Sequence, residues 1–347
     1  MKYIVSNNQN NLSIKNKAFP YQVEAFNALK DLEYAAIFHE QGLGKTKIAI
    51  DLIIYWLKNK DIDTVMIVTK KQLIKNWFEE FRFHTYIVPK VLSNNKQDNF
   101  YVLNSPVKVI VTNFETILSD RTRICLFLKS RNVGIIIDES AKLKNPNTKL
   151  AQTFFELSDL FKRKIIMTGT PIANRPYDIW AQIYFLDKGQ SLGTNFEEFK
   201  RKTNLTNTLN HDSSARSKFE QSVAEINQLI APFCVRETKK SCALNLPNKV
   251  YKSVFADFAI EQKEMYQKVL YTMKVEIEQK GNHIFDDDRV ALKRLIRLLQ
   301  ITSCPRLIDD NYQELSGKEV VLKNIIEKIM DRNEKCIVWS SFIKNIE

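Results

Sequence analysis

Cysteine is scarce in this chain of 347 residues, and the five that occur follow no recognisable pattern. They are scattered, and none has the spacing of a CxxC or Cys/His zinc site: Cys125, Cys234, Cys242, Cys304 and Cys336. A disulfide framework needs an even set in a secreted chain, and a structural zinc site needs closely spaced ligand pairs. The pattern therefore predicts reduced thiols in an intracellular protein and argues against a zinc site.

Long apolar runs are also missing. The polar N-terminus, residues 1–17, has no apolar region of a secretory signal. The richest apolar stretch, IAIDLIIYWL, is too short to cross a bilayer and contains Asp51. We therefore expect an intracellular, cytoplasmic protein without membrane contact, of bacterial or phage origin in preference to a nuclear one.

Basic residues exceed acidic ones, 52 Lys and Arg against 40 Asp and Glu, which gives a formal net charge of +12. This excess favours a polyanionic partner such as nucleic acid, although general solubility explains it about equally well. A hydrophobic content of 44% with 27% charged residues is typical of a soluble globular protein. The length predicts two domains.

From Tyr34 onward, short β-branched runs alternate with helical patterns. The runs YAAIF, TVMIVT, VKVIVT, VGIIID and KIIMTG are typical of strands. Between them, apolar residues recur at helical spacing, as in QLIKNWFEEFRF and TKLAQTFFELSDLF. Strands that alternate with helices need crossover connections, so the sequence predicts an α/β fold with a parallel sheet and helices on both faces.

After about Asp187 this rhythm changes. Residues 188–218 are polar and have no strand pattern. Helices are expected around Phe219–Leu229, Ile260–Lys280 and Asp287–Ile301. The helix–strand rhythm then resumes after residue 315, and Cys336–Ser340 is predicted to form a short buried strand.

The segment EQGLGKT follows the strand-like YAAIF and opens a helix, which is the context of a phosphate-binding loop. Gly42 and Gly44, on either side of Leu43, allow a tight turn whose N–H groups face phosphate oxygens. Lys45 adds a positive charge near the β- and γ-phosphates, and Thr46 offers a hydroxyl to Mg²⁺. The alternative is a chance glycine turn before a helix, which this combined context makes the weaker interpretation.

The segment GIIIDESAKLKN contains an acidic pair, Asp138 and Glu139, after four apolar residues. Ligands of parallel sheets bind at the carboxyl ends of the strands. There, Asp138 can hold Mg²⁺ through water and Glu139 can accept a proton from an attacking water. Acidic pairs also commonly cap helices, so this assignment depends on the phosphate loop.

Taken together, these motifs resemble the Swi/Snf-related DNA translocases of helicase superfamily two. EQGLGKT is similar to that family's DEMGLGKT, DESAKLKN to its DEAHRIKN, and MTGTPIANRPYDIW to its LTGTP…ElW segment. Further resemblance lies in FPYQVEAFNAL, TKKQLIKNWFEEF, VTNFETI, VRETKKSCALNLPNK, FADFAIEQKEMYQKVL and LLQITSCPRLI. The similarity follows the family's motif order over nearly the whole chain.

The resemblance implies a division into three parts. Residues 1–187 would form a first RecA-like lobe with an N-terminal adenine-reading segment, and residues 188–316 a helical insertion and linker. Residues 317–347 would begin a second RecA-like lobe whose remainder, including its arginine fingers, is missing. We therefore expect a shortened chain with weak activity.

The resemblance also implies roles for single residues. Gln22 would contact adenine, Glu139 would be the general base, and Thr46 and Asp138 would hold Mg²⁺. Residues Thr168, Gly169 and Thr170 would couple the two lobes. The expected DNA contacts are Lys70, Lys71, Asn76, Thr112, Asn113, Lys144 and Asn145. For any single lysine, a solvated surface position is about as good an interpretation.

Three positions depart from the family pattern. His39 and Gln41 replace Asp and Met in the phosphate loop, which the retained glycines and Lys45 should tolerate. Ala141 replaces the usual His, which affects how nucleotide state would reach the nucleic-acid face.

We expect an ATP- and Mg²⁺-dependent, DNA-stimulated translocase on duplex DNA. A strand-separating helicase subunit and a non-catalytic, ATP-switched DNA-binding scaffold are the alternatives.

Overall fold

The computed structural model describes residues 11–172, 175–203, 213–242, 249–279 and 288–346. The chain forms two compact units, residues 1–246 (unit 1) and 247–347 (unit 2), which are described separately. The predicted boundaries near residues 187 and 316 stay predictions.

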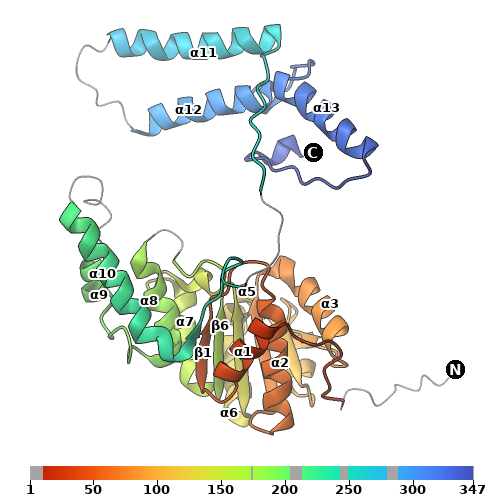
Figure 1. Cartoon of the computed structure of the whole chain (residues 1–347), viewed down its shortest axis with the longest axis vertical. Coiled ribbons are helices and arrows are strands. Elements are labelled where there is room, and N and C mark those ends of the chain that lie inside the picture. Colours follow the sequence, from red (N-terminus) through yellow and green to blue (C-terminus); the bar gives the residue numbers. More distant parts are fainter. Residues whose placement is uncertain (1–10, 173–174, 204–212, 243–248, 280–287, 347) are drawn as a thin grey trace, which may run out of the picture. The chain divides into compact units, whose positions relative to one another are not determined.

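Unit 1 contains a seven-stranded sheet in the order β3-β4-β2-β5-β6-β1-β7, in which every neighbouring pair is parallel (Figure 1). The strands are β1 (Tyr34–Ile37), β2 (Thr64–Thr69), β3 (Lys90–Val91), β4 (Val109–Asn113), β5 (Val133–Asp138), β6 (Arg163–Met167) and β7 (Cys234–Val235). The prediction of a parallel α/β fold is confirmed. The two-residue strands β3 and β7 were not predicted, because so short a segment carries no periodic signal.

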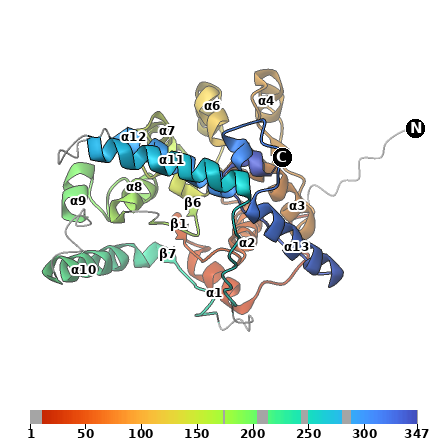
Figure 2. The same cartoon turned by 90° about the horizontal axis from the view of Figure 1, so that it is seen from above.

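Helices cover both faces of this sheet. One face packs against α1 (Pro20–Leu29), α2 (Lys45–Lys58) and α3 (Ile74–His84). The other packs against α4 (Lys96–Leu103), α5 (Phe114–Ser119), α6 (Arg121–Ser130), α7 (Lys149–Leu157), α8 (Trp180–Asp187), α9 (Phe196–Thr203) and α10 (Ser213–Ile230). Seen from above, α10 leads into β7 at one edge of the sheet (Figure 2).

The core of unit 1 is divided by the sheet into two layers. Alternate residues of β2 enter opposite layers, Val65 and Ile67 one and Met66 and Val68 the other. This alternation is expected of a strand that is buried on both faces. The resulting rigid sheet fixes the loops that leave its carboxyl ends.

Unit 2 is helical in its described part, with α11 (Ile260–Gln279), α12 (Asp288–Ser303) and α13 (Gly317–Asp331). The helices predicted from residues 260 and 287 are confirmed, as is α10 in unit 1. None of the described helices in either unit is long and apolar enough to cross a membrane.

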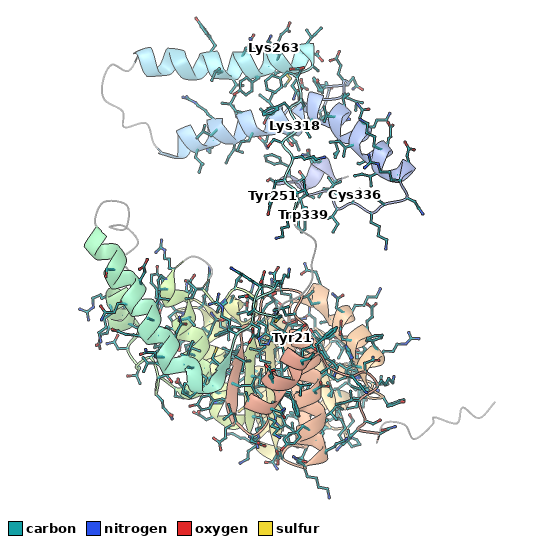
Figure 3. All side chains as sticks on the ribbon, in the orientation of Figure 1. Tyr21, Tyr251, Lys263, Lys318, Cys336 and Trp339 are labelled. Carbon is teal, nitrogen blue, oxygen red and sulfur yellow. The ribbon has the colours of Figure 1, made fainter. Side chains whose placement is uncertain are left out.

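The prediction of a buried strand at Cys336–Ser340 is wrong. These residues have no regular secondary structure, and Ile337 and Trp339 are 80% and 88% exposed. Figure 3 marks Cys336 and Trp339 on this C-terminal segment. A strand needs a neighbour for its backbone N–H and C=O groups. The described residues of unit 2 contain no strand that could pair with it.

Candidate active site

Five loops meet at the carboxyl edge of the unit 1 sheet. They follow β2, β5, β6, β1 and β7, which are consecutive neighbours in the sheet. Since parallel strands end on the same side, these loops bring together segments that are far apart in the sequence. The predicted phosphate loop, acidic pair and lobe-coupling segment are three of them.

The phosphate loop joins β1 to α2. Gly42 and Gly44 have φ of 84° and 68°, a left-handed conformation that favours glycine. A Cβ on Gly44 would clash with the amide of Gln22. Helix α2 begins at Lys45, so its first N–H groups, including that of the half-buried Thr46, lie at the loop.

Gln22, the predicted adenine contact, is buried against this loop. Its Nε2 donates to the carbonyl of Leu43 at 3.3 Å, and its Oε1 accepts from the N–H of Phe19 at 3.0 Å. Both groups of the amide are therefore engaged by the protein. Its position beside the phosphate loop fits an adenine-reading role, which stays a prediction.

Lys45 extends back across the loop that carries it. Its Nζ donates to the carbonyls of His39 and Glu40 at 3.0 and 3.3 Å. Burial lowers the pKa of this ammonium, and the carboxylates of Glu139 and Asp138 partly oppose that shift. The ammonium of Lys45 therefore interacts electrostatically with both predicted acidic residues, although these lie far along the chain from it.

Asp138 ends β5 and is fixed by two neighbours. Thr69 Oγ1 and Trp77 Nε1 each donate to Asp138 Oδ2 at 3.0 Å. Trp77 is only 2% exposed, so its ring packs in the core while its indole N–H holds Asp138. Since both of these bonds go to Oδ2, Oδ1 is the oxygen better placed to face a cation.

Glu139 adopts a left-handed conformation, with φ of 58° and ψ of 49°. For a residue with a Cβ this costs about 1–2 kcal/mol. Such strain persists only where the surroundings enforce it, and it is common at functional sites. The strained position coincides with the residue that the sequence assigns as general base.

A buried hydrogen-bond network holds the residue after Glu139. Ser140 Oγ donates to Gln182 Oε1 at 2.7 Å, and Gln182 Nε2 donates to the carbonyl of Pro171 at 2.8 Å and to that of Asp178 at 3.0 Å. Gln182 is fully buried, and its amide is completely paired. The network therefore joins the acidic loop after β5 to the Thr-Gly-Thr-Pro loop after β6.

The Thr168–Thr170 segment follows β6 and touches the phosphate loop. A Cβ on Gly169 would lie 2.7 Å from Gln41 Cγ and 3.5 Å from Lys45 Nζ. The N–H of Thr170 donates to Thr168 Oγ1 at 3.2 Å, which shapes the turn. Thr168 is buried and Thr170 is exposed, so only the latter offers its side chain to a partner.

The buried His39 lies beneath the phosphate loop. It is fully buried, and neither ring nitrogen has a hydrogen bond of normal geometry to a described residue. Burial lowers the pKa of the imidazole. The backbone of Val235 and the carboxylate of Glu237 oppose this shift, and Lys45 reinforces it. A neutral imidazole at this position keeps a further positive charge out of the loop interior.

The residues at this edge fit ATP and Mg²⁺ by their donor set. A glycine turn, a helix N-terminus and an ammonium bind phosphate oxygens. No group of three or more His, Cys, Asp or Glu side chains in the described residues could cage a metal. Mg²⁺ in phosphoryl-transfer sites needs no such group, because it uses one or two carboxylates together with substrate phosphates and water.

The predicted DNA contacts fall into two groups. Lys70 and Lys71 after β2 and Asn76 on α3 are exposed, as is Asn145, while Lys144 is half-buried. Thr112 is fully buried and donates to the carbonyl of Leu92 at 3.2 Å. A phosphate contact would need its side chain at the surface, so we leave Thr112 out of the proposed interface.

A groove of about 650 Å³ lies beside α3 and the ends of β3 and β4. Lys71, Lys75 and Asn113 are among its lining residues. Asn113 is 5% exposed, and its Oδ1 accepts from the N–H of Thr116 at 2.8 Å, which caps α5. Lys75 was not predicted, because a single lysine on an amphipathic helix is indistinguishable from a solvated one.

Comparisons with known proteins agree with the motifs. The SNF2-related domain matches residues 21–307. The chain is 25% identical to the ATP-dependent helicase MG018 of Mycoplasma genitalium, over 99% of the chain and 32% of that protein. It is 26% identical to the transcription regulatory protein SNF2 of Saccharomyces cerevisiae, over 86% of the chain and 19% of that protein. The chain therefore spans about a third or less of the length of these relatives.

A solved structure gives the same result. The SWI2/SNF2 ATPase core of Sulfolobus solfataricus in complex with dsDNA is 26% identical, with a TM-score of 0.56. The alignment covers 95% of this chain and 68% of that one. The predicted resemblance is confirmed, and the chain belongs to the SNF2-related family of ATP-dependent, helicase-like proteins.

Proposed function

We propose that this chain binds Mg-ATP at the carboxyl edge of the unit 1 sheet and hydrolyses it, and that hydrolysis drives translocation along duplex DNA. The observation that carries the proposal is the convergence of Lys45, Asp138 and Glu139. The ammonium of Lys45 lies within the electrostatic reach of both carboxylates, and Glu139 is held in a strained conformation.

The proposed roles follow from this arrangement. Lys45 and the amides of the Gly42–Gly44 turn hold phosphates, and Thr46 with Asp138 holds Mg²⁺ through oxygen ligands. Bound Mg²⁺ neutralises charge on the phosphates. Glu139 accepts a proton from the attacking water. Gln22 contacts adenine, and Thr168, Gly169 and Thr170 couple the site to a second lobe.

The proposed DNA face is formed by the exposed groups near the same edge. Lys70, Lys71 and Asn76, with Lys144 and Asn145, would contact backbone phosphates. The groove beside α3 supports this choice because Lys71 and Lys75 line it, as does the family resemblance to a core solved with dsDNA. Because these are phosphate-binding rather than base-reading groups, we propose binding that is largely independent of sequence.

The test is steady-state phosphate release by residues 1–347, with and without duplex DNA. Weak, magnesium-dependent release is expected, with a small increase that is the same for duplex DNA of any sequence. The affinity for DNA should fall steeply as salt rises, since each neutralised phosphate releases counterions. An affinity that is unchanged across the salt series would contradict the phosphate-contact proposal.

The two alternatives give different outcomes. A non-catalytic scaffold would bind ATP without releasing phosphate, with or without DNA. A strand-separating helicase would displace the labelled strand of a forked duplex in an ATP-dependent manner. A translocase would instead displace a triplex-forming third strand and leave the fork intact.

A further inference from the structure

The segment after β7 runs alongside the phosphate loop. Strand β7 pairs with β1 through Cys234 and Val235. The backbone pairing continues beyond both strands, since Phe38 N–H donates to Val235 O and Glu40 N–H donates to Glu237 O, each at 2.8 Å. Residues 236–239 are therefore fixed against the first residues of the loop.

Lys239 is the residue that this pairing brings to the phosphate-binding turn. Its backbone N–H donates to Glu40 Oε2 at 2.8 Å. Its side chain reaches Gly42, because a Cβ placed on that glycine would lie 3.7 Å from Lys239 Cε and 3.9 Å from Lys239 Nζ. The side chain is half-buried, whereas the next residue, Lys240, is exposed.

The ammonium of Lys239 has no ion-pair partner among the residues that the structure describes. It lies instead over a glycine whose left-handed turn presents N–H groups, which are themselves partial positive charges. A cation held against such a turn has no attractive partner there until an anion binds. Phosphate oxygens would satisfy the turn and the ammonium together.

We propose that Lys239 is a second phosphate-binding lysine of the nucleotide site, which contacts the polyphosphate chain of the nucleotide beside the Gly42 turn. This inference rests on the proposed nucleotide-binding function. It also ties nucleotide occupancy to a segment that lies a few residues before the end of unit 1. The segment belongs to the VRETKK stretch, to which the sequence assigned only a linker role.

The experiment is a calorimetric titration of ATP and of ADP onto the whole chain and its variants. Lys239→Met should weaken the binding of both nucleotides about tenfold, the effect of losing one charge-assisted hydrogen bond. Lys240→Met, which removes the same charge from the neighbouring exposed position, should bind within about twofold of the unaltered chain. Lys239→Arg keeps the cation and should restore most of the affinity.

Two results would overturn this inference alone. One is a Lys239→Met variant that binds ATP as tightly as the unaltered chain. The other is an equal loss in Lys240→Met, which would indicate a general charge effect. If Lys239→Met melts at a lower temperature without nucleotide, Lys239→Arg and Lys239→Gln are compared instead, and equal affinities would overturn the inference.

The proposed function fails in a different way. If the unaltered chain does not bind ATP, or if Lys45→Ala binds it equally well, the phosphate-loop assignment is wrong and the Lys239 inference falls with it. Loss of binding in Lys45→Ala together with unchanged binding in Lys239→Met would leave the proposed function intact.

Discussion

The two units differ in where their apolar side chains lie. In unit 1, every residue of β2 is buried, and two apolar layers enclose the sheet. In unit 2, helix α13 has no buried residue, and α12 exposes Leu292, Leu295, Ile296 and Leu299. Unit 1 therefore carries a core of its own, which holds the loops of the candidate site in place.

Polar contacts between separate segments also order unit 2. Gln262 is fully buried, donates to the carbonyl of Ile301 at 2.7 Å and accepts from the N–H of Gly317 at 3.0 Å. Ser316 caps α13 by accepting from the N–H of Glu319. The comparison indicates that the positions of the site residues depend on the enclosed sheet of unit 1. Truncating a buried side chain should therefore lower the stability of unit 1 more than truncating an exposed side chain lowers that of unit 2.

The largest difference is expected between matched core and surface truncations. Ile67→Ala in β2 should lower the free energy of unfolding of unit 1 by about 2–5 kcal/mol, because it leaves a cavity in a closed layer. Leu295→Ala on α12 should change that of unit 2 by less than about 0.5 kcal/mol, since this side chain is 53% exposed. Hydrogen–deuterium exchange measures the protection of backbone amides in each unit separately. Equal losses of protection in the two variants would contradict the proposed difference between the units.

The next largest effect concerns the residues that orient Asp138. Trp77→Phe removes one of the two hydrogen bonds to Asp138 Oδ2 while it keeps an aromatic ring in the core. Loss of such an outer contact typically costs 10–100-fold in metal affinity, so we expect about tenfold more Mg²⁺ for half-maximal ATP hydrolysis. Lys58→Ala, at the exposed carboxyl end of α2, is the control. An unchanged Mg²⁺ requirement in Trp77→Phe would mean that the indole only fills space.

A smaller effect is expected at the cap of α13 in unit 2. Ser316→Ala should destabilise this helix by about 1 kcal/mol, because it leaves a first-turn N–H without its acceptor. Lys318→Ala, at the exposed residue marked in Figure 3, is the control and should have almost no effect. Faster hydrogen exchange confined to the start of α13 checks the prediction. Exchange that is equal in both variants would argue against the cap.

The smallest effect is a pH dependence in unit 1. Burial lowers the pKa of His39, so below the ordinary histidine pKa of 6.5 the unfolded chain binds more protons than the folded one. Stability should therefore fall as the pH drops through that region, and His39→Gln should reduce the fall. The measurement is the melting temperature of both chains between about pH 7.5 and 5.5, about one unit either side of that pKa. Parallel curves would show that His39 does not titrate in this range.

Local signals made much of the site predictable. A strand followed by Gly42, Gly44 and Lys45 marks the turn and the helix start at once, and four apolar residues before Asp138 mark a buried strand. The contacts that complete the site are long-range. Trp77 and Asp138 are 61 residues apart, and Lys239 and Glu40 are 199 apart. Only the strand order brings these pairs together.

The sequence led to a wrong prediction for one strand, because strand formation depends on neighbouring strands. Cys336–Ser340 has the composition of a buried strand, but composition cannot supply the adjacent strand that would pair with it. Strand β7 shows the opposite case, a strand that the sequence did not predict. Two residues without a pattern become part of the sheet because β1 offers a free edge beside them.

In the proposed site, Glu139 acts as the proton acceptor and Lys45 binds the phosphates of ATP. The most direct test combines ATP titration with single-turnover hydrolysis in Glu139→Gln. Since only proton acceptance is lost, the affinity for ATP should stay within about threefold, while the hydrolysis rate should fall by about 10²–10⁴-fold. A Glu139→Gln variant that hydrolyses ATP at the rate of the unaltered chain would contradict the account.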